Sequence, residues 1–142
     1  MVFHTEVKGQ IIKEVHKLLA ARFIKPNQHS RWLSNIVPMK KKNGYIRCYI
    51  DFRNLNQVCL KDKFPLPDMY LLIDTAVGNA IFSFIEGFNR YNQIQMAPKD
   101  AEKTTFRTPI RNFYCTVMPF RLKNASTTYQ YTMTTIFHDM IH

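Results

Sequence analysis

The sequence predicts an α+β fold, and three features carry this prediction. An Asn43-Gly44 pair separates two apolar-rich runs, which predicts a β-hairpin over 34–51 with a type I′ turn, because both turn residues tolerate positive φ. A continuous apolar run at 80–85 predicts a buried strand. Apolar residues at helical spacing predict helices over 6–22 and 126–142. Strands interspersed with helices are typical of α+β domains.

Other local signals complete the predicted element order. Pro26 is expected to end the first helix, and Tyr45–Asp51 is expected to form the returning strand of the hairpin. Pro65-Leu66-Pro67 predicts an extended stop, after which Asp68 begins a short helix. Gly78 is expected to end that helix. Two further strands are predicted over 104–107 and 113–117.

Composition and charge narrow the classes of function. The 142 residues are 46% apolar and 13% aromatic, which is a globular composition. The formal net charge of +10, from 20 basic and 10 acidic residues, favours polyanions, with nucleic acid first and an anionic membrane second. A basic surface that only aids solubility explains the charge equally well.

The cysteines and the apolar runs exclude several classes of site. Cys48, Cys59 and Cys115 are widely spaced, so no C-x-x-C zinc or redox motif is indicated. The first ten residues lack the apolar run of a secretory leader, and no stretch approaches the ~20 apolar residues that span a bilayer. We therefore expect an intracellular protein with no signal peptide, transmembrane segment or membrane partner; the compartment is left open.

Four segments, taken together, carry a resemblance to one known family. They are a lysine-rich hairpin followed by Arg47-Cys-Tyr-Ile-Asp-Phe-Arg-Asn-Leu-Asn56, then Phe64-Pro-Leu-Pro67, then Phe82-Ser-Phe-Ile-Glu-Gly-Phe-Asn-Arg-Tyr-Asn-Gln-Ile94, and finally Met118-Pro-Phe-Arg-Leu-Lys-Asn-Ala125. Their order and spacing resemble the reverse transcriptase of gypsy-type LTR retrotransposons. Each segment alone is a weak signal, whereas the set is specific and covers residues 10–142.

The resemblance implies a fold and an activity. The fold would be the fingers and partial palm of a right-hand polymerase, truncated before the Y-x-D-D hairpin of the family. Residues 1–142 would be a single partial reverse transcriptase domain, with fingers over about 1–79 and a partial palm over about 80–142. The implied activity is RNA-templated DNA synthesis by nucleotidyl transfer. The implied partners are an RNA/DNA template–primer, deoxynucleotide triphosphates and, if ever joined, the remainder of a Pol polyprotein.

The resemblance also implies a magnesium site, which this sequence would leave incomplete. Nucleotide addition uses two metal ions roughly 3.5–4 Å apart, and Mg²⁺ prefers oxygen ligands. Glu86 stands where the family has its first catalytic aspartate, and it is therefore the expected catalytic and metal-binding residue. No two of the ten acidic residues are adjacent. Asp100 and Glu102 are close together, but we interpret them as solvated turn charges.

Further positions match the binding residues of the family. The implied nucleotide-binding residues are Lys40, Lys41, Lys42, Arg47, Tyr91 and Phe120. The implied template-binding residues are Arg53, Asn56 and Lys123. A solvated hairpin tip explains the three lysines equally well, and a core aromatic explains Tyr91. We expect Asp51 to pair with Arg47 or Arg53 rather than with a metal ion.

Three departures from the family pattern affect the expected activity. Glu86 is one methylene longer than aspartate, Asn89-Arg90 replaces Ser-Gly, and Arg121 replaces a glycine. Three interpretations stay open: an RNA-directed DNA polymerase whose tandem carboxylates are missing from this sequence, a basic nucleic-acid-binding remnant, or a decayed retroelement product with no function. We expect the chain alone to be catalytically inactive.

Overall fold

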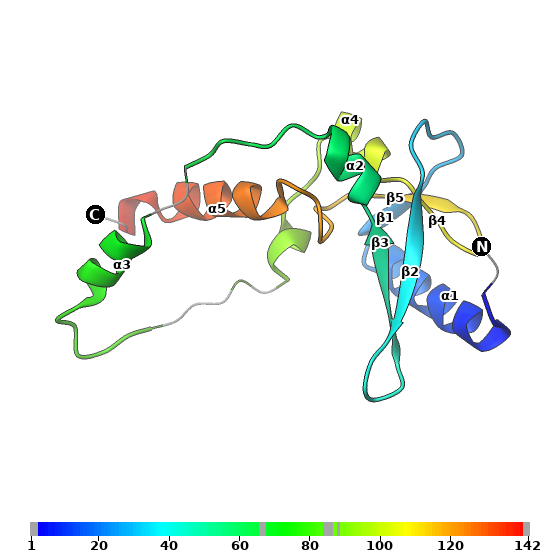
Figure 1. Ribbon diagram of the computed structural model, residues 1–142, viewed down its shortest axis with the longest axis horizontal. Helices are drawn as coiled ribbons and strands as arrows, with labels where there is room; N and C mark the ends of the chain where they lie inside the picture. Colours follow the sequence, from blue (N-terminus) through cyan, green and yellow to red (C-terminus); the bar gives the residue numbers. More distant parts are fainter. Residues whose placement is uncertain (1–2, 66–67, 84–86, 88, 141–142) are drawn as a thin grey trace.

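The computed structural model describes residues 3–65, 68–83, 87 and 89–140 (Figure 1). Along the chain the elements are α1 (Thr5–Ala20), β1 (Ile24–Pro26), β2 (Ser34–Lys40), β3 (Ile46–Asp51), α2 (Arg53–Val58), α3 (Met69–Ala76), the 3₁₀ turn η1 (Arg90–Gln93), α4 (Pro98–Ala101), η2 (Glu102–Thr104), β4 (Phe106–Arg107), β5 (Asn112–Cys115), α5 (Ala125–Ile136) and η3 (His138–Met140). No helix within the described ranges is long and apolar enough to cross a membrane.

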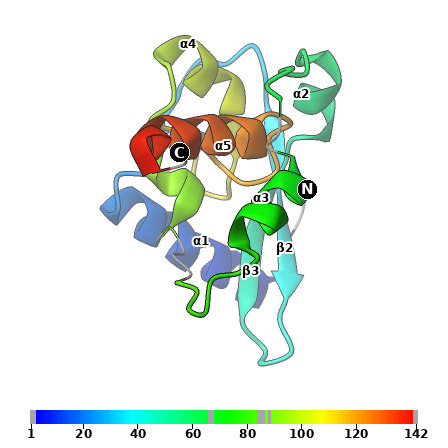
Figure 2. The same ribbon diagram turned by 90° about the vertical axis from the view of Figure 1, so that its left-hand side faces the viewer.

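The five strands form one sheet in the order β1-β5-β4-β2-β3. All neighbours are antiparallel except β2 and β4, which run parallel. The predicted hairpin is confirmed as β2 and β3, and its tip projects beyond the rest of the sheet (Figure 1). Figure 2 shows α2 and α4 near the other end of the sheet. The tip of the hairpin therefore lies far from these two helices.

Helix α1 packs on one face of the sheet and forms the core with it. Ile11 and Val15 are fully buried, four residues apart on one face of the helix. Phe106 and Phe113 meet them from the neighbouring inner strands β4 and β5. Burial of each such side chain stabilises the fold by about 1.5–3 kcal/mol. The predicted first helix is confirmed, and its apolar stripe is the reason it lies where it does.

The chain leaves α1 differently from what the sequence predicted. The helix ends at Ala20, and Arg22 adopts a positive φ of 59° that turns the chain into β1. Pro26 is the last residue of β1 rather than the residue that ends the helix. Strand β1 lies at the edge of the sheet, where a proline removes no ladder hydrogen bond.

The turn of the hairpin is not the predicted two-residue type I′ turn. The Gly44 N–H donates to the Lys41 carbonyl at 3.0 Å, and the Lys41 N–H donates to the Tyr45 carbonyl at 2.7 Å. Gly44 has φ 82°, whereas Asn43 is not among the residues with positive φ. This is a three-residue loop with a glycine at its left-handed position. Of the Asn43-Gly44 pair, only Gly44 adopts the positive φ that the sequence predicted for both residues.

The predicted buried strand at 80–85 is wrong for residues 80–83. These residues form no strand, and Ile81 is 87% exposed. Residues 84 and 85 lie outside the described ranges. An apolar run shows that burial of the segment would be favourable in free energy. A strand also requires a neighbouring strand whose backbone forms hydrogen bonds with it. None of the five described strands pairs with residues 80–83.

The remaining elements follow the predictions with shifted bounds. The strand predicted over 104–107 is reduced to β4, because Thr104 belongs to η2. The strand predicted over 113–117 is β5, and Val117 makes only an isolated bridge with Gln95. The helix predicted over 126–142 is α5, followed by η3, with residues 141–142 outside the described ranges.

Helix α3 confirms the predicted caps but has no core of its own. The Asp68 carboxylate accepts a hydrogen bond from the Tyr70 N–H at 2.9 Å, which caps the first turn. Gly78 follows the helix with φ 95°. No residue of α3 is buried, and Leu72 is 49% exposed. The helix lies at the far end of α5 from the sheet (Figure 1).

Candidate nucleic-acid interface

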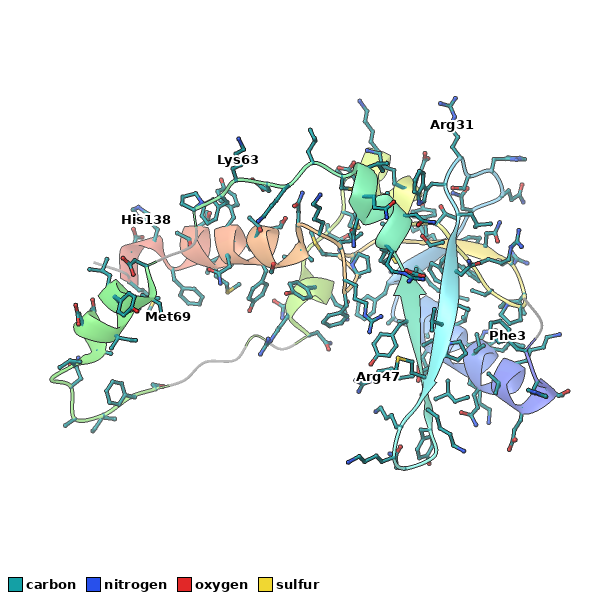
Figure 3. The ribbon with its side chains drawn as sticks, in the orientation of Figure 1. Phe3, Arg31, Arg47, Lys63, Met69 and His138 are labelled. Atoms are coloured by element: carbon teal, nitrogen blue, oxygen red, sulfur yellow. The ribbon has the colours of Figure 1, made fainter. Side chains whose placement is uncertain are left out.

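Strand β3 positions Arg47 and Tyr49 on the same face of the hairpin. Successive strand residues point to opposite faces, so Arg47, Tyr49 and Asp51 share one side. Cys48 and Ile50 point to the other side and pack against the α1 core. The Arg47 side chain extends from the hairpin toward the side on which η1 lies (Figure 3). Alternation along β3 therefore sends the cation to solvent and the apolar residues inward.

A cleft of about 840 Å³ lies between β3 and the loop that precedes α5. Strand β3 contributes residues from both of its faces, including Arg47 and Tyr49, and α1 contributes Glu14. Phe120 and Arg121 line the side formed by the loop. Asn89 contributes from the segment before η1. Two of the predicted nucleotide-binding residues, Arg47 and Phe120, thus meet at one cleft. Its volume falls within the range of ligand sites in proteins.

An aromatic cluster supports the Phe120 wall of this cleft. The Tyr91 ring packs edge-on against Phe120 with ring centroids 5.2 Å apart, and against Tyr129 at 5.6 Å. A side chain at Gly87 would place its Cβ 2.5 Å from the Tyr129 hydroxyl oxygen, so any other residue there would force the Tyr129 ring to shift. Tyr91 therefore packs behind Phe120 and does not itself line the cleft, so its predicted nucleotide-binding role stays a prediction.

The lysines at the hairpin tip do not gather with Arg47. Lys40 pairs with Ile46 in the register of the hairpin, so its side chain projects from the face opposite to Arg47. Lys41 and Lys42 lie in the exposed turn. Lys40, Lys41 and Lys42 do not line the cleft. The three lysines add positive charge to the hairpin without forming part of the cleft wall.

Asn56 and Lys123 hold two segments of the protein together. The Asn56 side chain donates to the Arg121 carbonyl at 2.8 Å and accepts from the Lys123 N–H at 2.9 Å. The Lys123 ammonium donates to the Asn56 carbonyl at 3.2 Å and to the Cys59 carbonyl at 2.8 Å. Asn124 continues the contact by donating to the Leu60 carbonyl. Two predicted template-binding residues therefore tie α2 and its following segment to the loop before α5.

Arg53 is engaged with Asp51 rather than projecting alone. Its guanidinium contacts both carboxylate oxygens of Asp51, at 2.7–3.0 Å. These hydrogen bonds hold the pKa of the Asp51 carboxyl below its usual range. The expected pairing of Asp51 with Arg47 or Arg53 is confirmed for Arg53. The Arg53 side chain is 85% exposed, so the contribution of the pair to stability is small.

Two arginines occupy backbone positions that favour glycine. Arg121 has φ 73°, and Arg90 has φ 28° directly after Asn89 at φ 54°. Residues with a Cβ rarely adopt these angles. Both arginines stand where the resembled family has glycine. The local backbone, in addition to any space needed by a substrate, is therefore a reason for glycine at these two positions.

Cysteine chemistry is not a feature of the cleft. Cys48 lines it, but burial raises the pKa of its thiol to about 11. Burial likewise raises the pKa of Cys115 to about 12. Thiolates are the nucleophilic and metal-binding form of cysteine. Both thiols are therefore protonated at neutral pH and act as small apolar side chains.

The described residues do not fit a magnesium site. No three His, Cys, Asp or Glu side chains come together within the described ranges in a way that holds a metal ion. Glu86, the predicted catalytic and metal-binding residue, lies outside the described residues. Asp100 forms an ion pair with Lys103 at 2.7 Å, which agrees with its interpretation as a turn charge. We derive no catalytic step through a metal ion from this geometry.

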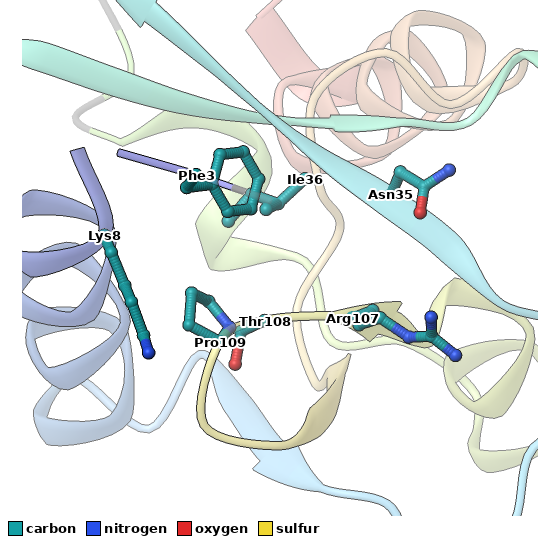
Figure 4. Close-up of a pocket in the computed structure, with 7 residues that line it drawn as sticks. All are labelled: Phe3, Lys8, Asn35, Ile36, Arg107, Thr108 and Pro109. Carbon is teal, nitrogen blue, oxygen red and sulfur yellow. The ribbon is translucent and has the colours of Figure 1, made fainter. Parts of the chain in front are cut away.

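A smaller pocket of about 150 Å³ opens beside α1 and is lined by two further basic side chains. Lys8 and Arg107 both line it, but their charged ends point in different directions (Figure 4). An anion site needs donors that converge on one point. This pocket therefore does not compete with the cleft as a binding site.

Comparison with known proteins shows the family to which this chain belongs. Residues 39–142 match the family model described as reverse transcriptase (RNA-dependent DNA polymerase). The chain belongs to the reverse transcriptase family. The matched range contains the whole of the cleft wall formed by Arg47, Tyr49, Phe120 and Arg121.

Curated reverse transcriptase relatives are much longer than this chain. The Pol polyprotein of the Drosophila melanogaster transposon opus is 32% identical over 134 residues, covering 90% of this chain and 13% of the relative. The Pol polyprotein of the transposon gypsy, from the same organism, is 29% identical over 141 residues, covering 95% of the chain and 14% of the relative. The chain thus corresponds to a small part of such polyproteins.

Solved structures agree on the fold. The foamy viral protease–reverse transcriptase in complex with dsDNA has a TM-score of 0.75 and 18% identity, and the match covers 97% of this chain and 29% of that chain. The predicted α+β fold of the fingers and palm region is confirmed. The boundary near residue 79 between fingers and palm stays a prediction, as do the predicted roles of the individual site residues.

Sequence reasoning missed two features of the reverse transcriptase cleft. Tyr49 was not singled out, although its alternation with Arg47 along β3 was available as a signal. The Asn56 clamp was missed because its partners lie 65 and 67 residues away along the chain. Only the three-dimensional structure reveals a contact of that sequence separation.

Proposed function

We propose that this chain supplies the fingers and part of the palm of an RNA-directed DNA polymerase, and that its own task there is to bind the template–primer and the phosphates of the incoming deoxynucleotide. The cleft supports this proposal most directly, since Arg47 and Phe120 line the same cleft in a strongly basic protein. Guanidinium suits phosphate because its planar donors form paired hydrogen bonds. The double-stranded DNA in the related foamy viral complex points to the same ligand class.

The proposal predicts nucleic-acid binding that is independent of sequence and depends steeply on salt. Each phosphate that a cation neutralises releases counterions, so the slope of log affinity against log salt is about −0.9 per contact for duplex DNA. We expect Arg47→Ala to make this slope less negative by about one contact. Arg111→Ala is a matched control, because Arg111 is an exposed arginine that does not line the cleft.

Fluorescence anisotropy with a labelled primer–template at several salt concentrations measures both quantities. A wild-type affinity that does not change between low and physiological salt contradicts the proposal. An equal effect of Arg47→Ala and Arg111→Ala also contradicts it, because the charge alone would then matter and not the cleft. That second result favours a basic remnant with no defined site.

The 142-residue chain is proposed to lack polymerase activity by itself. Reverse transcriptases use divalent metal ions, and the only carboxylate of this sequence at a matching catalytic position is Glu86. Two ions need more ligands than one side chain offers. Primer extension on an RNA template with Mg²⁺ or Mn²⁺ should therefore give no product above a Glu86→Ala control. Any extension that depends on Glu86 contradicts this part of the proposal.

A further inference from the structure

The Arg121 side chain covers the ring of Tyr49. Its guanidinium carbon lies 4.3 Å from the centroid of that ring, well within the distance at which cation–π attraction operates. Arg121 comes from the loop before α5, and Tyr49 comes from β3 on the other wall of the cleft. The contact therefore joins the two sides of the cleft at one point.

The backbone of Arg121 is fixed in a way that directs this side chain. The Asn56 amide donates to the Arg121 carbonyl and accepts from the N–H of Lys123, so both ends of the short loop are held. Arg121 itself sits at φ 73°. A side chain on a backbone that is both hydrogen-bonded and left-handed leaves the loop in a defined direction, here toward β3. The contact with Tyr49 is thus built into the loop.

Tyr49 is well placed to meet a bound strand. It follows Arg47 by two residues on the same face, so the two side chains leave the strand about 7 Å apart. A cation for the backbone beside an aromatic ring for a base is the arrangement with which proteins grip single-stranded nucleic acid. Stacking on such a ring tolerates any base, because every base has a π-face.

We infer that the Tyr49 ring is a stacking platform for an unpaired base of single-stranded nucleic acid, and that Arg121 covers this platform while no strand is bound. This inference rests on the nucleic-acid binding proposed above. Base stacking on an aromatic ring is stronger than an exposed cation–π contact, so a base displaces the guanidinium. Because the base must first displace the guanidinium, the apparent affinity for the strand is lowered by about two- to five-fold. This factor is the equilibrium constant that corresponds to the free energy of an exposed cation–π contact.

The test compares two labelled oligonucleotides of equal length, oligo(dT) and an abasic strand with the same phosphates. The measured quantity is the ratio of the two affinities, in which the loss of a protein charge largely cancels. Arg121→Gly should raise the ratio about two- to five-fold by uncovering Tyr49. Tyr49→Leu should bring the ratio close to one. Tyr70→Leu should not change it, because Tyr70 lies on α3, outside the cleft.

A second variant guards against a folding defect. Arg121→Asn keeps a residue that tolerates positive φ but is too short to reach the Tyr49 ring, so it should act like Arg121→Gly. Circular dichroism melts verify that each variant folds. If the affinity ratio is unchanged or lower in both Arg121 variants, Arg121 does not cover Tyr49. If the ratio is unchanged in Tyr49→Leu, Tyr49 is not a stacking platform. Failure of the proposed function looks different, because the wild type would then bind neither oligonucleotide.

Discussion

The sheet region and the α3 region differ in what covers their apolar side chains. In the sheet, Phe106 and Phe113 are each only 1% exposed because α1 lies over them. Along α3, the run Met69-Tyr70-Leu71-Leu72-Ile73 is at least as apolar, yet each of these side chains is about half exposed or more. Sequence hydrophobicity measures how much a segment gains by burial, whereas the facing element decides whether burial occurs. Apolar surface of this extent marks regions that associate with other surfaces.

The two regions meet at the loop before α5. The segment after α2 is fastened there by Asn56, Lys123 and Asn124. Further along, Phe64 packs edge-on against Tyr131 of α5, with ring centroids 5.4 Å apart. Leu55 and Ala125 are buried beside this junction, whereas no residue of α3 is buried. The free energy of unfolding of the α3 region should accordingly be lower than that of the sheet region.

The largest difference is expected from truncating one apolar side chain in each region. Phe106→Ala leaves a cavity in the core and should lower the free energy of unfolding by about 3–5 kcal/mol. Leu72→Ala removes a half-exposed side chain and should change it by no more than about 0.5 kcal/mol. Urea denaturation followed by circular dichroism measures both. Comparable losses in the two variants would show that α3 is packed as firmly as the sheet.

The junction between the regions should respond to Asn56→Ala. This change removes the two hydrogen bonds of the side chain to the loop before α5. Loss of two bonds at a half-buried site should cost about 1–2 kcal/mol. Gln57→Ala, at the exposed neighbouring position of α2, is the control. Hydrogen exchange should also become faster in residues 121–124, and unchanged exchange there would contradict the clamp.

Each region contains one glycine with positive φ, so the same glycine-to-alanine substitution can be made in both. Gly44 and Gly78 both have positive φ, and an added Cβ meets nothing within 4 Å at either position. Alanine should therefore cost about 1 kcal/mol of backbone strain at each site. We expect only Gly44→Ala to lower the urea midpoint of the sheet, because Gly78 ends a helix with no buried residue. A lowered midpoint in Gly78→Ala as well would mean that the two regions unfold together.

The smallest effect is expected from Asp51, on the exposed edge of the hairpin. Its pKa is lowered in the folded state, so the ion pair with Arg53 stabilises the fold above the ordinary aspartate pKa. That contribution is lost as pH falls through the folded pKa, which lies below 3.8. Asp51→Asn should therefore differ from wild type slightly at pH 7, and the difference should shrink as the carboxylate is protonated. A difference that grows on acidification has the wrong sign for this pair.

Local signals predicted the elements that depend on neighbouring residues. The stripe that contains Ile11 and Val15 predicted α1, and the Asp68 cap predicted the start of α3. Strand β1 was missed because three residues carry too little pattern. Burial of residues 80–83 was predicted wrongly because it depends on partners distant in the chain. Arg47 and Phe120, which the family resemblance named, line one cleft, whereas the contact of Arg121 with Tyr49 is visible only in the structure.

The strand order also has a consequence for the timing of folding. Residue 24 pairs with residue 115, and β2 pairs with β4, so the sheet joins the beginning of the chain to its last third. A ribosome that adds about 5–20 residues per second needs on the order of ten seconds to make the intervening stretch. Until then α1 and the hairpin wait without Phe106 and Phe113, the two side chains that complete their core. The hairpin edge that later pairs with β4 is open to other strands throughout that interval.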